Sequence, residues 1–458
     1  MNQTTDSRYV AAVEIGSSKI IAAVGIADEK GRLTILAVEQ MKGLESVRHG
    51  IIQNAEEVAS RLNAIIERLE RRADIAPRQI EAIFVGLAGR SMKCVRVDSS
   101  LRLPEETEIT AAHLDDLRNL ALESAIDTSL EIIDAIPCSY DVARTETQNP
   151  VGIIGDSISA TFDLIVCRPN LKKNLLRAIK DKTGIEVANF VVTPVAVSHL
   201  ILRPEEKRLG CMLVDMGAET TTVLIFKNNN IQYFATLPMG SRNITRDIIS
   251  LNFLEERAEE IKKAQGCAVL PEVPSMIDID DVPLRDIIDR IVARSEEIVA
   301  NVIEQINYAG MTPNDLPGGI IAIGGGFKLS GMVDLISVKS GMSVRRGALP
   351  PFVEIDDTKA PASEIIQVGS ILYAGATMSD KECLSVPVKE DLPHGDDPED
   401  LPETPEETVS GKRGKKTEGG KPSGFGKFFG SLKGRMSSFF TGESDDDEEN
   451  DGSELDDE

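Results

Sequence analysis

The sequence predicts an α/β fold built from two related halves, and three short segments carry this prediction. Two of them, residues 9–26 and 211–226, are apolar runs interrupted by a small polar turn, which is the pattern of a β-hairpin. The third is an apolar strand at 320–323 that runs into three consecutive glycines. With 458 residues, the chain has enough apolar material for two or three domains.

The two hairpins match each other in register, which indicates a duplication. Glu14 and Asp215 are 201 positions apart, and so are Gly16 and Gly217. A Gly/Ser/Thr turn directs backbone N–H groups and hydroxyls outward, where they can bind phosphate oxygens. The alternative is that these are two ordinary β-hairpins with polar tips. We expect the turns to hold a polyphosphate and the two acids to hold Mg²⁺ through water. The candidates are Glu14, Gly16, Ser17, Ser18 and Lys19 in the first hairpin, and Asp215, Gly217, Thr220 and Thr221 in the second.

The glycine turn after residue 323 is the third part of the predicted site. Consecutive glycines permit positive φ and let the backbone approach a ribose or a flat ring without interference from Cβ atoms. A lone triple glycine is a weak signal, but its position behind two phosphate-type hairpins strengthens it. The candidates here are Gly324, Gly325, Gly326 and Lys328.

These segments resemble the actin-like ATPase superfamily, which has a duplicated ribonuclease H-like fold. The resemblance implies two connecting helices at an interdomain hinge, at 193–198 and 365–372. It also implies ATP and Mg²⁺ as ligands. By the same resemblance, a helical segment that follows Gly240 places Glu259 and Lys262 near the ribose and the adenine.

Residues 84–168 are similar to the extra subdomain of the FtsA family of bacterial division proteins, which replaces the usual second subdomain of actin. The motifs that carry this are Asn149-Pro150-x-Gly152 and Glu259-x-x-Lys262-x-x-x-Gly266, and matching elements cover about residues 8–380. The expected organisation is a first half at 1–84 and 169–198, an inserted subdomain at 85–168, a second half at 199–380 with a small subdomain at about 242–315, a disordered linker at 381–420, an amphipathic helix at 421–442 and an acidic tail at 443–458.

Three residues depart from the family pattern at the expected site. Glu14 stands where Asp is usual, Glu219 where Gly is common, and Thr222 where many relatives have a second Asp. Thr193 occupies the place where active members of the superfamily have an acid or Gln that positions the attacking group. A hydroxyl is a feeble base, so we expect at most weak ATP hydrolysis, with nucleotide acting as a conformational ligand.

Composition excludes several other classes of protein. The net charge of -25 and an aromatic content of 4% without Trp disfavour nucleic-acid binding. The chain has no GxxxxGK[ST] motif and no HExxH motif, which argues against a P-loop nucleotide-binding protein and against a zinc enzyme. Six cysteines without a CxxC pair indicate a reduced, cytoplasmic protein, and no apolar run is long enough to span a membrane.

The C-terminal segment has the pattern of a membrane-binding helix. Residues 411–442 hold eight bases and one acid, whereas residues 443–458 hold eleven acids and no base. Apolar residues repeat with helical spacing, and bases lie off this stripe. A final helix that docks on the body is the alternative. The stripe consists of Phe425, Phe428, Phe429, Leu432, Met436, Phe439 and Phe440, and the bases beside it are Lys427, Lys433 and Arg435.

The resemblance implies a scaffold of cell division at the cytoplasmic face of the inner membrane, at the septum. Such a protein binds ATP, polymerises, anchors FtsZ filaments of the Z ring to anionic lipid and recruits later divisome membrane proteins. The FtsZ C-terminal tail is expected on the small subdomain of the second half, where Arg285, Arg290 and Arg294 form the candidate surface. Because these bases alternate with acids, a solvated helix face is the alternative. The alternatives are an actin-like scaffold of pilus assembly and a metabolic kinase of the same superfamily.

Overall fold

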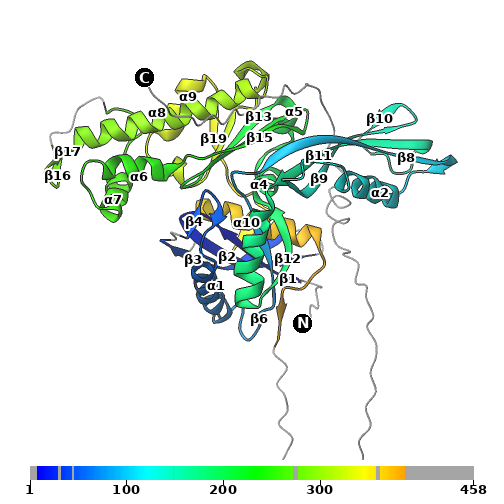
Figure 1. Cartoon of the computed structure of the whole chain (residues 1–458), viewed down its shortest axis with the longest axis horizontal. Coiled ribbons are helices and arrows are strands. Elements are labelled where there is room, and N and C mark those ends of the chain that lie inside the picture. The colour runs from blue at the N-terminus through cyan, green and yellow to red at the C-terminus, as the bar shows by residue number, and fades with distance from the viewer. Residues whose placement is uncertain are drawn as a thin grey trace, which may run out of the picture.

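The computed structural model describes residues 8–28, 32–43, 46–147, 149–271, 277–356 and 362–386. Three larger sheets organise this part of the chain, one in each half and one in the inserted subdomain (Figure 1). Both predicted hairpins are present: Glu14 pairs with Ile21 in the first, and Asp215 pairs with Thr222 in the second. The duplication inferred from the sequence therefore has a structural counterpart.

The sheet of the first half has the strand order β12-β7-β1-β2-β3-β20. The first three strands along the chain are antiparallel, and the other three pair in parallel. The strands are β1 (Arg8–Ile15), β2 (Lys19–Ala27), β3 (Leu33–Lys42), β7 (Ala82–Leu87), β12 (Glu186–Val192) and β20 (Val353–Ile355).

The sheet of the second half repeats this plan in the order β15-β14-β13-β18-β19. Its first three strands are antiparallel, and β18 and β19 follow in parallel. Alternate residues of the central strand β13 face two different cores, because both faces of the sheet are covered. The strands are β13 (Cys211–Met216), β14 (Thr221–Lys227), β15 (Asn230–Leu237), β18 (Ile320–Ile323) and β19 (Val344–Arg346).

Amphipathic helices cover the two sheets. In α1 the side chain of Asn54 accepts hydrogen bonds from the backbone N–H groups of Glu56 and Glu57, which caps the helix, and an apolar stripe faces the core. The predicted connecting helices are present as α4 and α10, which pack against each other. The helices of the two halves are α1 (Ala55–Glu70), α3 (Pro169–Leu176), α4 (Thr193–Ile201), α5 (Pro204–Leu209), α6 (Ser241–Ile249), α7 (Glu255–Gln265), α8 (Leu284–Tyr308), α9 (Met332–Ser340) and α10 (Ile366–Met378).

The inserted subdomain is a four-stranded sheet with its own core, and it lies beside the second half (Figure 1). Arg96 joins the two, since its guanidinium donates to the carbonyl of Ile231 in β15 at 3.4 Å. Ion-paired Asp163 holds this arginine at 3.3 Å. The elements are β8 (Lys93–Glu108), α2 (Ala111–Leu122), β9 (Glu131–Val142), β10 (Thr145–Thr147) and β11 (Ile154–Cys167).

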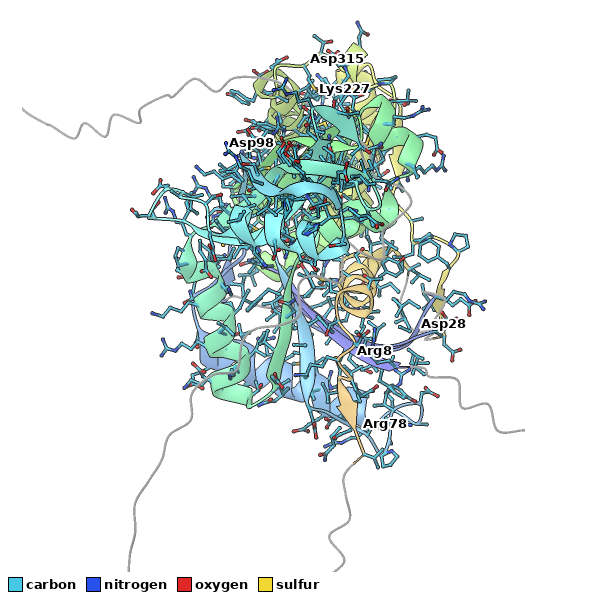
Figure 2. The ribbon with its side chains drawn as sticks, turned by 90° about the vertical axis from the view of Figure 1, so that its right-hand side faces the viewer. Arg8, Asp28, Arg78, Asp98, Lys227 and Asp315 are labelled. Carbon is cyan, nitrogen blue, oxygen red and sulfur yellow. The ribbon has the colours of Figure 1, made fainter. Side chains whose placement is uncertain are left out.

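The two ends of the described chain meet in the first half. Arg8 pairs with Asp380 at 3.2 Å, and the guanidinium of Arg78 lies 4.3 Å from the centre of the Tyr9 ring. Arg8 and Arg78 both lie in the lower part of Figure 2, whereas the ion pair of Lys227 with Asp315 lies at the top, in the second half. Short strands complete the fold: β4 (Val47–Arg48), β5 (Ile51–Ile52), β6 (Gln79–Ile80), β16 (Asp278–Ile279), β17 (Val282–Pro283) and β21 (Leu384–Ser385).

In the part of the chain that the structure describes, no helix combines the length and the apolar character needed to cross a bilayer. The predicted disordered linker from residue 387 on, the amphipathic helix at 421–442 and the acidic tail lie outside the described residues. The first residues of the predicted linker are instead part of the fold, because β21 pairs with β6.

Candidate functional site

Two carboxylates from equivalent strands form the base of the candidate site. Glu14 near the end of β1 and Asp215 near the end of β13 interact electrostatically. Burial raises the pKa of Glu14 to about 7, the charge of Asp215 adds to this effect, and the charge of Lys19 opposes it. Burial also raises the pKa of Asp215 to about 6. The two halves thus bring their matching acids together, at a place where a cation would lower the cost of their charge.

Gln367 also belongs to this site, although sequence reasoning gave it no role. Its side-chain amide, in the first turn of α10, donates to both carboxylate oxygens of Asp215 at 3.3 and 3.2 Å. These hydrogen bonds favour the ionised form of Asp215 and oppose the effect of burial. The residue lies within the predicted connecting helix, but only the fold brings it to an acid 152 positions away.

The two turns share one local geometry. The N–H of Gly16 donates to the carbonyl of Lys19 at 3.0 Å, and the N–H of Gly217 donates to the carbonyl of Thr220 at 2.8 Å. Gly240 lies directly against the second turn, because a Cβ at this position would come within 2.6 Å of the carbonyl oxygen of Gly217. The turn of the second hairpin and the start of α6 therefore form one packed unit.

The glycine turn packs against the same hairpin. Gly324 has a φ of +93°, and a Cβ there would lie 2.4 Å from the carboxylate of Asp215. A Cβ at Gly326 would lie 2.4 Å from Met216, whereas nothing lies within 4 Å of one at Gly325. Only Gly324 of the three adopts a positive φ. Close packing requires glycine at Gly326, whereas Gly325 faces open space.

Glu259 and Lys262 are brought together on α7 with a threonine of α6. Thr245 donates to Glu259 at 2.7 Å and accepts from Lys262 at 2.8 Å, and the two charged groups pair at 2.6 Å. Lys262 also donates to the carbonyl of Ser241 at 3.2 Å, which ties α7 to the start of α6. A Cβ at Gly266 would meet the carbonyl of Lys262 at 2.3 Å, so the glycine of this motif ends the helix.

Lys19 and Lys328 come from different halves and share one partner. Lys19 lies 3.6 Å from the carboxylate of Glu364, and Lys328 donates to the same carboxylate at 2.7 Å. Gln40 donates to it as well, at 3.1 Å. Neither Glu364 nor Gln40 was identified from the sequence.

Glu219, the unusual acid of the second hairpin, does not carry an unbalanced charge into the site. Its side chain is 1% exposed and accepts hydrogen bonds from Arg48 at 2.8 Å, from Arg242 at 3.1 Å and from Arg246 at 3.3 Å. The backbone N–H of His49 donates to it at 2.9 Å. Burial alone would raise the pKa of Glu219, but these hydrogen bonds outweigh it and lower the pKa.

The three arginines of the predicted partner surface differ in environment. Arg285 and Arg290 are exposed on α8, whereas Arg294 pairs with Asp247 at 2.6 Å and so fastens α8 to α6. An FtsZ-binding role for them remains a prediction. The candidate membrane residues, from Phe425 to Phe440 with their bases, lie outside the described residues.

Comparisons with known proteins agree with this architecture. The family model described as "Cell division protein FtsA" matches residues 212–363, and the model "SHS2 domain inserted in FTSA" matches residues 89–166. Together they cover half of the chain. The second model falls on the inserted subdomain.

Curated relatives carry the same description. The cell division protein FtsA of Porphyromonas gingivalis is 28% identical over 331 residues, 70% of this chain and 68% of the relative. The FtsA of Pseudomonas aeruginosa is 24% identical over 400 residues, 84% of this chain and 94% of the relative. The FtsA of Bacillus subtilis is 28% identical over 363 residues, 76% and 80% of the two chains.

Among solved structures, a chain of the PilM-PilN type IV pilus biogenesis complex is similar, with a TM-score of 0.57 and 14% identity. The match covers 80% of this chain and 98% of that one. At this identity the likeness concerns the fold alone. The actin-like fold with an FtsA-type insert, as predicted from the sequence, is confirmed. The chain belongs to the FtsA family of cell division proteins.

Proposed function

We propose that this cell-division protein binds ATP with Mg²⁺ between its two halves, polymerises, and anchors FtsZ filaments to the cytoplasmic face of the membrane at the septum. The domain boundaries expected from the sequence are part of this proposal. The observation that carries it is that the buried acids Glu14 and Asp215, near the ends of equivalent strands, are close enough for the charge of Asp215 to raise the pKa of Glu14.

The donor set at this pair fits magnesium. Hard carboxylate oxygens suit this cation, which usually keeps several waters and binds one or two carboxylates together with substrate phosphates. Among the residues that the structure describes, no group of three or more His, Cys, Asp or Glu side chains is placed to hold a metal alone. A site with two carboxylates, completed by phosphate oxygens of the nucleotide, matches the ligand preference of magnesium. When bound, the ion would neutralise phosphate charge.

The remaining residues suit the other parts of ATP. The turns at Gly16 and Gly217 have the small residues that phosphates require at close range, and the open space beside Gly325 suits the nucleoside. Glu259 and Lys262, already joined to the start of α6, are the proposed ribose and adenine contacts.

Hydrolysis is proposed to be weak. Thr193 is 2% exposed, and its hydroxyl has no hydrogen-bond partner among the described residues. No carboxylate or amide side chain replaces it at the start of α4. ATP is therefore proposed to act by favouring one arrangement of the halves.

The membrane and partner roles rest on sequence. The apolar stripe at 425–440 would enter an anionic leaflet, with Lys427, Lys433 and Arg435 at its surface, and each base adds about 1 kcal/mol of attraction. The FtsZ C-terminal tail is proposed to meet α8 near Arg285 and Arg290, and later divisome membrane proteins would join the same assembly.

The test is co-sedimentation of purified FtsZ with anionic liposomes and the full-length chain, with and without Mg·ATP. We expect recruitment with nucleotide. The double substitution Phe428→Ala/Phe429→Ala should reduce it at least tenfold, since each buried ring contributes about 1.5 to 3 kcal/mol. Asp215→Asn should abolish the dependence on nucleotide.

The matched control is Ser437→Ala/Ser438→Ala, which changes the same segment off the stripe and should leave recruitment unchanged. Recruitment that ignores both nucleotide and the two rings would contradict the proposal. ATP turnover with a small hydroxylated acceptor would favour a kinase. The pilus-type scaffold has no need for a tethered lipid helix, so nucleotide binding with neither membrane binding nor FtsZ recruitment would favour it.

A further inference from the structure

Glu364 occupies a position where it holds two lysines that the proposed site needs. It ends the short 3-10 turn Ala362–Glu364, two residues before α10. One carboxylate oxygen accepts from Lys328 at 2.7 Å, and the other accepts from Gln40 at 3.1 Å and lies 3.6 Å from Lys19. The carbonyl of Glu364 also accepts from Lys19, at 3.4 Å.

These contacts join the two halves. Lys19 is the first residue of β2, directly after the first turn, and Gln40 lies in β3 of the same sheet. Lys328 ends the 3-10 turn Gly325–Lys328, which contains two of the three glycines in the second half. Gln40 fixes the arrangement further, because its amide oxygen accepts from Lys19 at 3.2 Å.

The carboxylate is ionised under all ordinary conditions. Burial alone would raise the pKa of Glu364, but hydrogen bonds from Lys328 and Gln40 and the charge of Lys19 outweigh it and lower the pKa to about 2. The side chain of Glu364 is only 19% exposed, so water screens its attraction to the two lysines only weakly.

A carboxylate and a phosphate use the same donors. An ammonium that pairs with a carboxylate must give up this partner, or share it, before it can pair with a phosphate oxygen. The lysines at the phosphate turn and at the glycine turn are both engaged in this way, through one residue.

We propose that Glu364 is an internal anion that holds Lys19 and Lys328 in the nucleotide-free protein and that ATP must displace. The inference rests on the proposed nucleotide site and adds a residue that sets its affinity. Glu364 lies two residues before α10, and Gln367 in the first turn of this helix donates to Asp215, so we expect a displacement of Glu364 to affect the contact between Gln367 and Asp215.

The first test uses lysine acetylation of the full-length, nucleotide-free protein, read by mass spectrometry. Glu364→Gln should raise the acetylation rates of Lys19 and Lys328 several-fold. Lys339, which pairs with Glu296 at 2.8 Å elsewhere in the second half, should not change and is the internal control. Unchanged rates at Lys19 and Lys328 would overturn the proposal.

The second test is calorimetric titration with Mg·ATP. Glu364→Gln should bind about three- to tenfold more tightly than the native chain, which is the scale of one or two partly exposed ion pairs. The matched control is Glu67→Gln, which removes the same charge from an exposed pair with Arg71 on α1 and should leave affinity unchanged. Circular dichroism confirms that both variants are folded.

The two tests separate the possible failures. If the native chain binds ATP and Glu364→Gln binds equally or more weakly, Glu364 instead positions the lysines, and the inference is wrong while the site stands. If neither protein binds ATP, the proposed function is wrong and the competition falls with it. The acetylation rates then report only whether the carboxylate shields the lysines.

Discussion

At the scale of single residues, the paired acids Glu14 and Asp215 make the stability of the nucleotide-free protein depend on pH. Each has a raised pKa in the folded state, to about 7 and about 6 from ordinary values of 4.5 and 3.8. Between these limits the folded chain binds more protons than the unfolded one. The contribution of these two acids to the stability is therefore greatest below about pH 4 and is lost as the pH rises through about 7.

The variant Glu14→Gln removes the pH dependence of stability that comes from Glu14, the acid with the higher of the two pKa values. In EDTA at pH 8, we expect it to be more stable than the native chain by about 1 to 3 kcal/mol, and the gain should shrink at pH 5. Urea unfolding at the two pH values measures the difference. Glu67→Gln is the matched control, because it removes the same charge from the exposed face of α1, away from the two acids. A gain that is equal at both pH values would show that Glu14 is not protonated in the folded chain.

At the scale of elements, the glycine turn shows how neighbouring identical residues have different tasks. A Cβ at Gly326 would overlap Met216 of β13, whereas one at Gly325 meets nothing. Gly326→Ala should therefore destabilise the protein by about 1 to 3 kcal/mol, and Gly325→Ala by less than about 0.5 kcal/mol. Thermal unfolding of the two variants measures this. Equal losses would contradict the packing described here.

The elements around the site could be predicted because their signals are local. A hairpin needs two apolar runs and a turn, and β1–β2 and β13–β14 both follow that pattern. The glycine turn was likewise visible as an apolar strand followed by three glycines, whereas the connecting helices were expected only from the resemblance to the family. Resemblance to a family then supplied what single segments could not, namely the order in which they meet.

The contacts that complete the site could not be predicted, because they join residues far apart in the chain. Glu364 and Lys19 are 345 positions apart, and Arg48 and Glu219 are 171 apart. Nothing near Glu364 or Gln367 in the sequence distinguishes them from surface polar residues. The sequence showed only that Glu219 departs from the family pattern, because the arginines that balance its charge come from two other segments.

At the scale of the whole molecule, Glu219 is the buried carboxylate that holds the two halves together on the side of the second hairpin. Arg242 and Arg246 belong to its own half, whereas Arg48 and the N–H of His49 belong to the first half. The contact is thus partly internal to one half and partly between halves. Removing the carboxylate would deprive Arg48, Arg242 and Arg246 of the buried negative charge that they share.

Arg48 and Arg246 form a matched pair for separating the contact between the halves from the contact within the second half. Arg48 belongs to the first half and Arg246 to the second, and their exposures are similar, at 45% and 48%. Glu219→Gln should destabilise the protein by about 2 to 4 kcal/mol and increase the distance between fluorescent labels on the two halves. Arg48→Gln should increase this distance as well, and the double variant should add little, because both changes break the same bridge. Arg246→Gln should lower stability slightly and leave the distance unchanged. If Arg246→Gln separates the halves as much as Arg48→Gln does, Glu219 acts by holding the second hairpin in shape and does not join the halves directly.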